Sequence, residues 1–498
     1  MGVRSRLATL LKEAPESAEA VEFDGSWWTW RDLRSVGRDL GDLLDDAGFG
    51  AASRIGVVLE NRPEHLGVVI ALLATDRCLV TLSPLQPPER LAEDIARCAA
   101  GVVVASPEML ASAQVLGAIT DAGLALELGS DGKMRARGGR SEPEAATSPS
   151  IAVEMLTSGT TGPAKRVRLR DAQLDTAMAS SGQTPRDDSL LRSGIGIVAT
   201  PMVHIGGLWG AVSGLYAGRR IVLLPRFTLE SWLRAVETHR PRAAGLVPAA
   251  LRTLLDADVP PEKLAGLQVI TCGTTFCPPE LAERFFARYG VRVLMTYGAT
   301  EFAGAVAAWT LPMHLKWWDT KAGSAGRALA GVRLRVVGPD GSVLGADEVG
   351  QLEVRTEQSP QGRADWVRTS DLGRVDGDGF VWIHGRADDA IIRGGFKVRP
   401  DQVRAALERH PAVQEAAVAG LPHDRLGQVP VAAVQCRPGS APPEVPELIA
   451  LCRQLLTPYE VPVHVLVLGE LPRTPSSKVS RVELLDLVRA DMAEQGAA

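Results

Sequence analysis

The sequence has few cysteines, no dominant sign of charge and no long apolar run. Six of its 498 residues are Cys, and no two of them form a C-x-x-C pattern, which argues against a disulfide framework or a zinc site. Lys plus Arg number 54 and Asp plus Glu 59, so the net charge is −5. This balance disfavours a general binder of nucleic acids or anionic membranes. The most apolar run, Leu66 to Thr75, is about half of the ~20 residues that a membrane span needs.

Lysine is also scarce, because only eight of the 54 basic residues are Lys and the other 46 are Arg (54 − 8 = 46). A lysine in such a chain is expected where a compact, mobile ammonium group is needed. Three of the eight, Lys165, Lys397 and Lys478, fall inside the motifs described below. Their positions are therefore candidates for a functional role.

The amino-terminal segment lacks the features of a targeting sequence. Charged residues recur at Lys12 and Glu13, before any apolar core of a signal peptide has formed. Position 6 is Arg, where the myristoylation pattern requires Ser or Thr. Hydrophobic residues make up 45% and charged residues 23%, as is usual for folded soluble proteins. We expect a cytoplasmic protein with more than one domain, because 498 residues exceed the usual size of a single domain.

The first third of the chain alternates segments typical of helices with segments typical of strands. Helices are expected at Trp30–Ala47 and Pro63–Ala74, and strands at Ile55–Glu60, Cys78–Leu82 and Gly101–Ala105. This alternation indicates βαβ units and a mostly parallel sheet. Residues 129–149 are polar and rich in Gly, Arg, Ser and Glu, which predicts an exposed connection.

The pattern changes along the rest of the chain. Strands and helices keep alternating between residues 219 and 271. From Gly331 on, strand-type segments follow one another without long helices, which predicts a small barrel or an antiparallel sheet. A compact α+β segment follows Gly385 and begins with a helix at Pro400–Arg409. We place the domain boundary near Asp388, with domains at 1–387 and 388–498.

The strongest local motif is a segment of small and hydroxyl residues that ends in Lys. It reads Thr157-Ser158-Gly159-Thr160-Thr161-Gly162-Pro163-Ala164-Lys165. Backbone N–H groups and hydroxyls of such a segment can surround a phosphate chain, with Lys165 adding positive charge. The segment does not fit the Walker A spacing, since positions 164 and 166 are Ala and Arg. Composition alone also allows an ordinary surface loop.

Three further segments carry side chains suited to a nucleotide. The first is Tyr297-Gly298-Ala299-Thr300-Glu301, with an aromatic ring for a base, a hydroxyl for a phosphate and a carboxylate for Mg²⁺. The second spans residues 368–398 and holds Asp371, Arg386 and a Gly-Gly turn before Lys397. The third surrounds Lys478 near the carboxyl end. Taken singly, each also fits a turn or a solvated surface.

Taken together and in this order, the four motifs resemble the adenylate-forming superfamily of acyl-CoA synthetases, peptide-synthetase adenylation domains and luciferases. The resemblance runs from Trp28-Thr29-Trp30 to Arg481. It implies an α/β and α+β fold: a large N-terminal domain of two βαβ-type sheets plus a small β-barrel, followed by a small mobile C-terminal domain. It also implies ATP, Mg²⁺ and CoA as reactants, with a carboxylic acid converted first to acyl-AMP and then to a thioester.

The resemblance assigns a role to each matching residue. The 157–165 segment holds phosphates, and Tyr297 stacks on adenine beside Gly273-Thr274-Thr275. Gly298 and Ala299 also belong to the ATP site, and Thr300 touches phosphate. Glu301 binds Mg²⁺, Asp371 accepts the ribose hydroxyls with Arg386 nearby, and Lys478 bridges carboxylate and α-phosphate. Asp388 is the hinge, and Gly394, Gly395, Phe396 and Lys397 serve the thiol step at the CoA tunnel.

Three positions depart from the family's usual pattern. Ser477 stands where Gly usually precedes the catalytic Lys, Cys272–Phe276 replaces a Gly-Gly-Ala-Pro-type turn, and Thr369-Ser370-Asp371 replaces Thr-Gly-Asp. None of these departures removes a functional group. The first affects the segment that carries Lys478, and the second affects contacts to adenine or to the acyl group.

The acyl pocket is expected around Pro201–Gly207 and the Tyr297 motif. In amino-acid-activating members a carboxylate binds the α-ammonium group, but this chain has His204-Ile205 there, which argues against an amino acid substrate. We expect His204 to orient the acyl carboxylate or gate the tunnel, although a core histidine is the alternative. Gly298, Ala303 and Gly304, with Ala305 and Ala307, suggest room for a medium, bulky or aromatic acid.

Three hypotheses for the function follow. The favoured one is a free-standing acyl-CoA synthetase. The second is an adenylate-forming ligase with an amine or a carrier-protein thiol as acceptor, as in secondary metabolism. The third is a half-reaction protein that keeps the fold and uses a supplied acyl-AMP. Neither nucleic acid nor membrane is expected as a partner, and the sequence leaves the oligomeric state open.

Overall fold

The computed structural model describes residues 2–496 except 140–149, 158–164, 183–184, 186–188, 275, 361–364, 387–390, 394–395, 424–425 and 475–477. Several residues with an expected role lie outside this description: Ser158, Gly159, Thr160, Thr161, Gly162, Thr275, Asp388, Gly394 and Gly395. For Thr157, Lys165, Phe396 and Lys397, the structure describes the strand but not the side chain. The roles assigned to these residues stay predictions.

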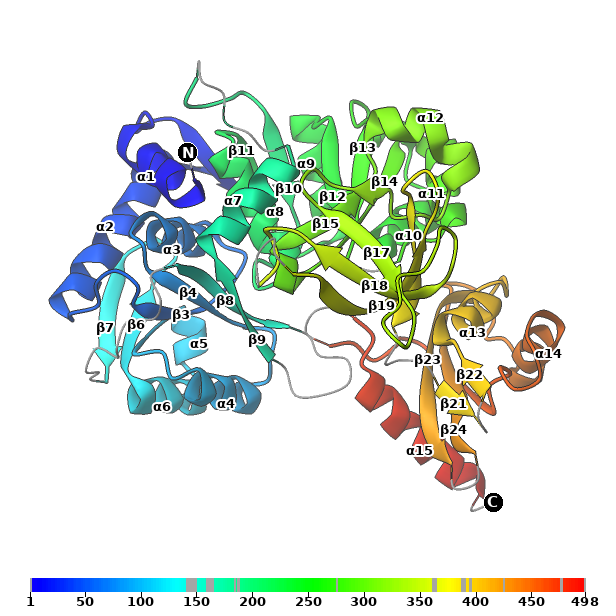
Figure 1. Ribbon diagram of the computed structural model, residues 1–498. Coiled ribbons are helices and arrows are strands. Elements are labelled where there is room, and N and C mark those ends of the chain that lie inside the picture. Colours follow the sequence, from blue (N-terminus) through cyan, green and yellow to red (C-terminus); the bar gives the residue numbers. More distant parts are fainter. Residues whose placement is uncertain are drawn as a thin grey trace.

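A seven-stranded sheet organises the first 170 residues (Figure 1). Its strand order is β7-β6-β5-β3-β4-β8-β9. The neighbouring pairs from β6 to β8 are parallel, while β7 and β9 run antiparallel at the two edges. The strands are β3 (Arg54–Val58), β4 (Cys78–Leu82), β5 (Val102–Ala105), β6 (Leu124–Leu128), β7 (Met134–Gly138), β8 (Ile151–Thr157) and β9 (Lys165–Arg170). The parallel core agrees with the expected βαβ units.

Helices connect the strands of this sheet and cover it. They are α1 (Val3–Glu13), α2 (Trp30–Asp46), α3 (Pro63–Ala74), α4 (Pro88–Cys98), α5 (Pro107–Leu110), α6 (Ala113–Ala122) and α7 (Asp171–Ser180). Thr29 caps α2 and accepts a hydrogen bond from the Asp32 backbone N–H, while the Asp32 carboxylate accepts from the Thr29 N–H. This reciprocal pair fixes the start of the helix.

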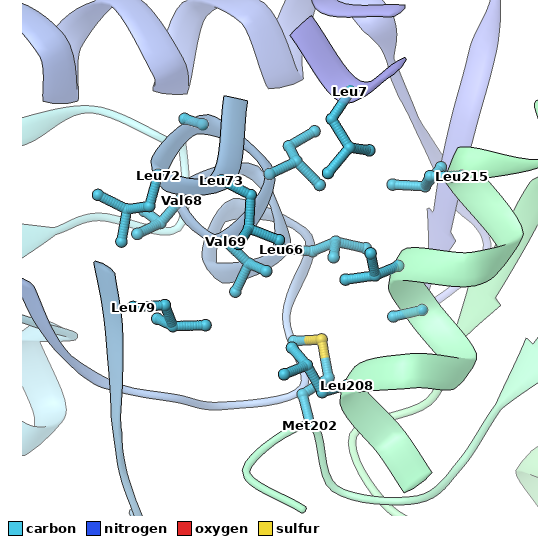
Figure 2. Close-up of a cluster of buried hydrophobic side chains, with 14 of the residues drawn as sticks. Leu7, Leu66, Val68, Val69, Leu72, Leu73, Leu79, Met202, Leu208 and Leu215 are labelled. Atoms are coloured by element: carbon cyan, nitrogen blue, oxygen red, sulfur yellow. The ribbon is translucent and has the colours of Figure 1, made fainter. Parts of the chain in front are cut away.

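The largest hydrophobic core lies around α3, which is buried on every side (Figure 2). Leu66, Val69 and Leu73 of this helix pack between α1, the sheet and the later helix α8 (Ile205–Tyr216). Burying one such side chain contributes about 1.5–3 kcal/mol. The same cluster contains Met202 and Leu208, so the core directly supports the segment that enters α8.

Two smaller sheets continue the large domain. One has the order β10-β11-β1-β2 and the other β12-β13-β14-β15-β16. Their strands are β1 (Glu19–Phe23), β2 (Ser26–Thr29), β10 (Ile195–Val198), β11 (Arg220–Leu223), β12 (Ala243–Leu246), β13 (Val269–Cys272), β14 (Arg292–Ala299), β15 (Gly304–Ala308) and β16 (Arg327–Ala328). The helical elements beside them are α9 (Leu229–His239), α10 (Pro248–Asp256), η1 (Pro261–Leu264), α11 (Pro279–Tyr289), η2 (Thr300–Phe302) and α12 (Leu311–Lys321).

An antiparallel sheet and a small α+β domain complete the chain (Figure 1). The sheet comprises β17 (Arg333–Val337), β18 (Gly350–Arg355), β19 (Val367–Val375) and β20 (Val381–Arg386). The C-terminal domain contains β21 (Ile391–Arg393), β22 (Phe396–Val398), α13 (Pro400–Leu407), β23 (Val413–His423), β24 (Gly427–Cys436), α14 (Val445–Leu455), β25 (His464–Leu468) and α15 (Arg481–Gly496). In the part of the chain that the structure describes, every helix is too short or too polar to cross a membrane.

One expectation about local structure was wrong. Residues 129–149 were expected to form an exposed connection, but Met134–Gly138 is strand β7 and pairs antiparallel with β6. The alternating polar side chains of this strand are mostly exposed, because it lies at the edge of the sheet. An edge strand with one solvated face needs few apolar residues, so composition alone misclassified it.

Candidate active site

The candidate site lies where the turn after β14 meets strands β19 and β20. The hydroxyl of Tyr297 donates a hydrogen bond of 2.5 Å to Oδ2 of Asp371. Asp371 in turn lies opposite Arg386 in the pairing of β19 with β20. Two segments far apart in the sequence thus bring together three residues predicted to bind adenosine.

The local fold fixes Asp371 in place. The hydroxyl of Thr369 accepts a 3.1 Å hydrogen bond from the Asp371 backbone N–H and donates one of 2.9 Å to the Leu352 carbonyl. Burial, together with the neighbouring Asp371 carboxylate, raises the pKa of Tyr297 well above its usual range. Tyr297 therefore stays a neutral donor at any physiological pH.

Lys478 reaches this site from the C-terminal domain. Its backbone carbonyl accepts hydrogen bonds from the Thr474 backbone N–H at 2.7 Å and from the Thr474 hydroxyl at 3.1 Å, which ties the backbone at Lys478 to Thr474. The Lys478 residue keeps contact with solvent, although protein atoms partly surround its ammonium group. Partial desolvation lowers its pKa, and the Arg386 charge lowers it further, while Asp371 and Glu301 oppose the shift. One ammonium group thus shares a site with two carboxylates and a guanidinium from the large domain.

Polar contacts between the domains support this placement of Lys478. Arg252 of α10 pairs with Glu408, at 3.4 Å between Nη2 and Oε2. Asp256, at the end of the same helix, accepts a hydrogen bond of 3.4 Å from Gln414 and pairs with Arg437 at 3.4 Å. Both partners of the Arg252–Glu408 pair are largely buried, so solvent screens it less than a surface ion pair. These contacts hold the C-terminal domain in the orientation that brings Lys478 to the site.

The lowered pKa of Lys478 predicts a limit on activity at alkaline pH. An ammonium group that stabilises negative charge acts only while it is protonated. Adenylation should therefore fall as the pH rises through a value below 10.5, the ordinary pKa of lysine. Pyrophosphate release from pH 7 to 11 measures this limit. Lys478→Arg should move the alkaline limb upward, and an unchanged limb in this variant would assign it to another group.

Gly273 and Thr274 lie at the end of β13, beside β14. A Cβ atom on Gly273 would stand 2.3 Å from the hydroxyl oxygen of Thr296, so only glycine fits. Thr274 has a φ of +70°, a left-handed conformation that is uncommon for threonine. The Thr274 methyl group lies 3.8 Å from where a Cβ on Gly206 would stand. The segment expected to flank adenine therefore also lies close to the first turn of α8.

His204 is the residue immediately before α8, and its backbone is extended. Its N–H donates a hydrogen bond of 3.0 Å to the Pro201 carbonyl, and its carbonyl accepts one of 2.9 Å from the Leu208 N–H. The buried side chain of Asn61 fixes the preceding segment. It donates a hydrogen bond of 3.0 Å to the Thr200 carbonyl and accepts one of 2.6 Å from the Met202 N–H. His204 is partly exposed, and its role at the acyl pocket stays a prediction.

The expectation that Gly298 and Gly304 leave room for the acyl group stays a prediction, and the structure shows what their Cβ positions face. A Cβ on Gly298 would lie 2.1 Å from the Gly304 carbonyl oxygen, and one on Gly304 would lie 2.9 Å from Cδ1 of Trp209. Protein atoms thus lie in the Cβ direction of both glycines, although Gly298 itself is exposed, and Ala303 is fully buried in the core. These small residues allow β14, β15 and α8 to pack closely. The exposed Gly206, on the first turn of α8, is the position next to Thr274 that leaves space.

The hairpin of β8 and β9 carries the two ends of the phosphate motif. Thr157 and Lys165 are paired across the hairpin. Arg166 is held by Asp94 of α4, at 2.9 Å, and by the Thr81 carbonyl at 3.1 Å. Both side chains of this ion pair are largely buried, so breaking it would leave an uncompensated charge. The start of β9, the strand at which the motif ends, is therefore firmly anchored.

The described residues form no resident metal site. Among them, no three His, Cys, Asp or Glu side chains gather in a way that could hold a metal ion. Magnesium usually binds to one or two carboxylates plus substrate phosphates. Glu301, on η2 directly after Tyr297-Gly298-Ala299-Thr300, fits that donor set. A magnesium ion would therefore enter with ATP.

Sequence reasoning missed four residues that shape the site: Asn61, Trp209, Gln173 and Gln358. Gln173 and Gln358 are fully buried amides, and Asn61 is nearly so. No sequence signal separates a buried glutamine from a surface one. For Trp209, its position one turn after Ile205 in the His204 motif was the only available hint.

Comparison with known proteins agrees with this geometry. Residues 9–362 match the AMP-binding enzyme family, and residues 402–478 match the AMP-binding enzyme C-terminal domain. The chain belongs to the AMP-binding enzyme family. A sulfoacetate–CoA ligase of Cupriavidus necator is 30% identical to it, over 95% of this chain and 94% of that protein. A 4-coumarate–CoA ligase of Oryza sativa subsp. japonica is 28% identical, over 92% and 89%.

Solved structures of this family share the fold. The amide bond synthetase McbA from Marinactinospora thermotolerans superposes with a TM-score of 0.81. It is 24% identical, and the alignment covers 98% of this chain and all of that one. The match confirms the expected combination of a large N-terminal and a small C-terminal domain. The exact boundary near Asp388 stays a prediction.

Proposed function

We propose that this protein is an AMP-forming acyl-CoA synthetase. The observation that carries the proposal is that Lys478, a residue of the C-terminal domain, lies within electrostatic range of Asp371, Glu301 and Arg386 of the large domain. Such an arrangement brings one mobile ammonium group to a site suited to a nucleotide. The similarity to CoA ligases over almost the whole chain supports the same reaction.

The first step forms acyl-AMP from a carboxylic acid and Mg-ATP. A carboxylate oxygen attacks the α-phosphorus, the bond to the β-phosphate oxygen breaks, and pyrophosphate leaves. Lys478 balances the negative charge that grows on the α-phosphate in the transition state. Asp371 would hold the ribose and Tyr297 would lie against the base, while Thr300 would contact the phosphates and Glu301 would bind the magnesium ion that accompanies them. Holding both reactants together removes much of the entropic cost of the encounter.

The second step transfers the acyl group to the thiol of CoA. The thiol sulfur attacks the carbonyl carbon of acyl-AMP, the bond to the phosphate oxygen breaks, and AMP leaves. We propose that the C-terminal domain turns about Asp388 for this step, so that Lys478 withdraws and the segment 394–397 takes its place. Lys397 then serves the thiol step. The reaction requires no membrane or nucleic acid, and we propose that it takes place in the cytoplasm.

The acid is proposed to be medium-sized, bulky or aromatic. The space next to Thr274 lies along the first turn of α8, where the exposed Gly206 has no side chain. Trp209 lies one turn further along, with the pyrrole edge of its indole against Gly304. Position 205, next to His204, is Ile rather than an acidic residue, so nothing there pairs with an α-ammonium group. An apolar wall of this kind favours size and shape over a particular functional group.

A side chain at Gly206 should narrow the range of acids. Gly206→Leu places an isobutyl group beside Thr274, and a residue with better helix propensity should leave α8 intact. The KM for an aromatic acid should rise roughly tenfold, while a short acid such as propionate loses less than twofold. Gly117→Leu, on the open surface of α6, is the control because nothing lies within 4 Å of its Cβ position. Equal losses for large and small acids would show that Gly206 does not border the acyl group.

An amine or a carrier-protein thiol is the second candidate acceptor. The structural similarity to the amide bond synthetase McbA favours keeping it, since the fold alone does not select the acceptor. The two candidates share the adenylation step and differ only afterwards.

Product analysis distinguishes the acceptors. The protein is incubated with Mg-ATP and a panel of aliphatic and aromatic acids, with CoA, with a simple amine or with neither, and the products are identified by mass spectrometry. The proposal predicts an acyl-CoA and AMP in the CoA arm for at least one acid class. An amide in the amine arm, with no thioester in the CoA arm, would replace CoA by an amine as the acceptor.

A further inference from the structure

Two fully buried glutamines, Gln173 and Gln358, lie directly behind the turn that presents Thr300 and Glu301. Gln173 belongs to the first turn of α7, and Gln358 follows β18. An amide without hydrogen bonds in a protein interior costs several kcal/mol, so these side chains are retained only if their partners repay that cost. The partners are backbone groups of three separate segments.

Gln173 links the phosphate hairpin to the Glu301 turn. Its Oε1 accepts a hydrogen bond of 2.9 Å from the N–H of Arg170, the last residue of β9. Its Nε2 donates to the Glu301 carbonyl at 3.1 Å and to the Gln358 carbonyl at 2.7 Å. A single side chain thus joins the end of β9, the η2 turn and the segment after β18.

Gln358 completes the bridge from the other side. Its Nε2 donates to the carbonyls of Phe302 and Ala305, both at 3.3 Å. The guanidinium of Arg170 donates a hydrogen bond of 2.9 Å to the carbonyl of Ser359, the residue after Gln358. The carboxyl end of β9 and the segment after β18 are therefore tied to one buried network, which we call the glutamine bridge (Gln173 and Gln358).

The η2 turn depends on this bridge because it is too short to satisfy its own carbonyls. It comprises only Thr300–Phe302. The Ala303 N–H donates a hydrogen bond of 2.9 Å to the Thr300 carbonyl. The next two carbonyls, of Glu301 and Phe302, accept from the two glutamines instead. Backbone carbonyls at the end of a short helix need such external donors. The bridge thereby fixes the backbone from which the Thr300 and Glu301 side chains extend.

We propose that Gln173 and Gln358 are positioning residues for the Mg-ATP half of the reaction. They hold the Thr300–Glu301 backbone at a fixed distance from the hairpin that carries the phosphate motif. This inference rests on the proposed function, because it assigns Thr300 and Glu301 to the phosphates and the magnesium ion. Since CoA transfer from acyl-AMP involves neither pyrophosphate nor its magnesium ion, the bridge should matter for adenylation alone.

The test compares Gln173→Met and Gln358→Met with the wild type in the two half-reactions. Methionine keeps the length of the side chain and removes the hydrogen bonds. Adenylation is followed by acid-dependent exchange of labelled pyrophosphate into ATP, and transfer by thioester formation from supplied acyl-AMP and CoA. We expect the KM for Mg-ATP to rise roughly 10- to 100-fold and the magnesium requirement to increase, with acyl transfer within twofold of wild type.

Two controls separate positioning from a general loss of stability. Val104→Ala creates a cavity in the core of the seven-stranded sheet, away from the bridge, and should lower the melting temperature without changing the KM for Mg-ATP. In a Glu301→Gln background, Gln173→Met should add little to the loss of adenylation, because both changes affect one group. If Gln173→Met does not fold, Gln173→Glu keeps the acceptor for Arg170 and removes the donors.

Three outcomes would overturn the inference: an unchanged KM for Mg-ATP, equal losses in both half-reactions, or additive effects with Glu301→Gln. A wild type without acid-dependent exchange is a different result, since it would overturn the proposed function itself. The two failures are therefore distinguished in the same experiment.

Discussion

Replacing Lys478 by alanine should lower the rate of acyl-AMP formation roughly 10²- to 10³-fold. This is the usual effect of removing one group that stabilises charge in a transition state. Lys478 is the residue that the C-terminal domain contributes among Asp371, Glu301 and Arg386, so no described neighbour offers a second mobile ammonium group. Exchange of labelled pyrophosphate into ATP, in the presence of a substrate acid, measures the effect.

The same variant should still transfer an acyl group from supplied acyl-AMP to CoA. That step needs no stabilisation of the leaving pyrophosphate, so its rate should stay within a few-fold of wild type. Lys478→Arg is the matched control, because it keeps the charge and changes the shape. It should retain more adenylation than the alanine variant. Unchanged pyrophosphate exchange in Lys478→Ala would remove this residue from the reaction.

The second large effect is expected at Asp371. Asp371→Asn removes the charge that faces Tyr297 and Arg386 and leaves a weaker acceptor for a ribose diol. Hydrogen bonds to an ionised group are about twice as strong as neutral ones, so the KM for ATP should rise roughly 100-fold. The KM for the acid should change little. Steady-state kinetics with each substrate varied in turn measures both constants.

Tyr297→Phe is the matched control for this prediction. It removes the 2.5 Å hydrogen bond to Asp371 and keeps both the ring and the carboxylate. If the carboxylate itself binds the nucleotide, this variant should lose less than tenfold in the KM for ATP. A loss as large as that of Asp371→Asn would mean that the hydrogen-bonded pair, rather than the carboxylate, makes the contact.

The sequence predicted most of the fold because its hydrophobic patterns are strong. The helix expected at Pro63–Ala74 and the strand at Cys78–Leu82 have those same bounds in the structure. Both are mostly apolar segments with clear ends, and the helix begins with proline, a residue favoured at that position. The polar edge strand Met134–Gly138 offered no comparable pattern and was missed.

The candidate site was predictable where several residues form a motif and unpredictable where one buried residue acts alone. The motifs around Tyr297, Asp371 and Lys478 led to residues that the structure brings together. Gln173 and Gln358 act through backbone carbonyls of distant segments, and pairing of that kind has no sequence signature. Gly298 and Gly304 are a related case, because their Cβ directions face the neighbouring strand and Trp209. A missing side chain can make room for a ligand or for a neighbouring strand, and only coordinates tell these apart.

The most direct test of the central claim is acid-dependent exchange of pyrophosphate into ATP by the purified protein. The exchange needs neither CoA nor any other acceptor, so it isolates adenylation from the choice of acceptor. The panel should include short and medium-chain fatty acids, benzoates, arylacetates and cinnamates, with Mg-ATP present throughout. We predict exchange with at least one bulky or aromatic acid and none without an acid. If no acid supports exchange, or if exchange proceeds at the same rate without an acid, the assignment of this site to acyl-AMP formation is contradicted.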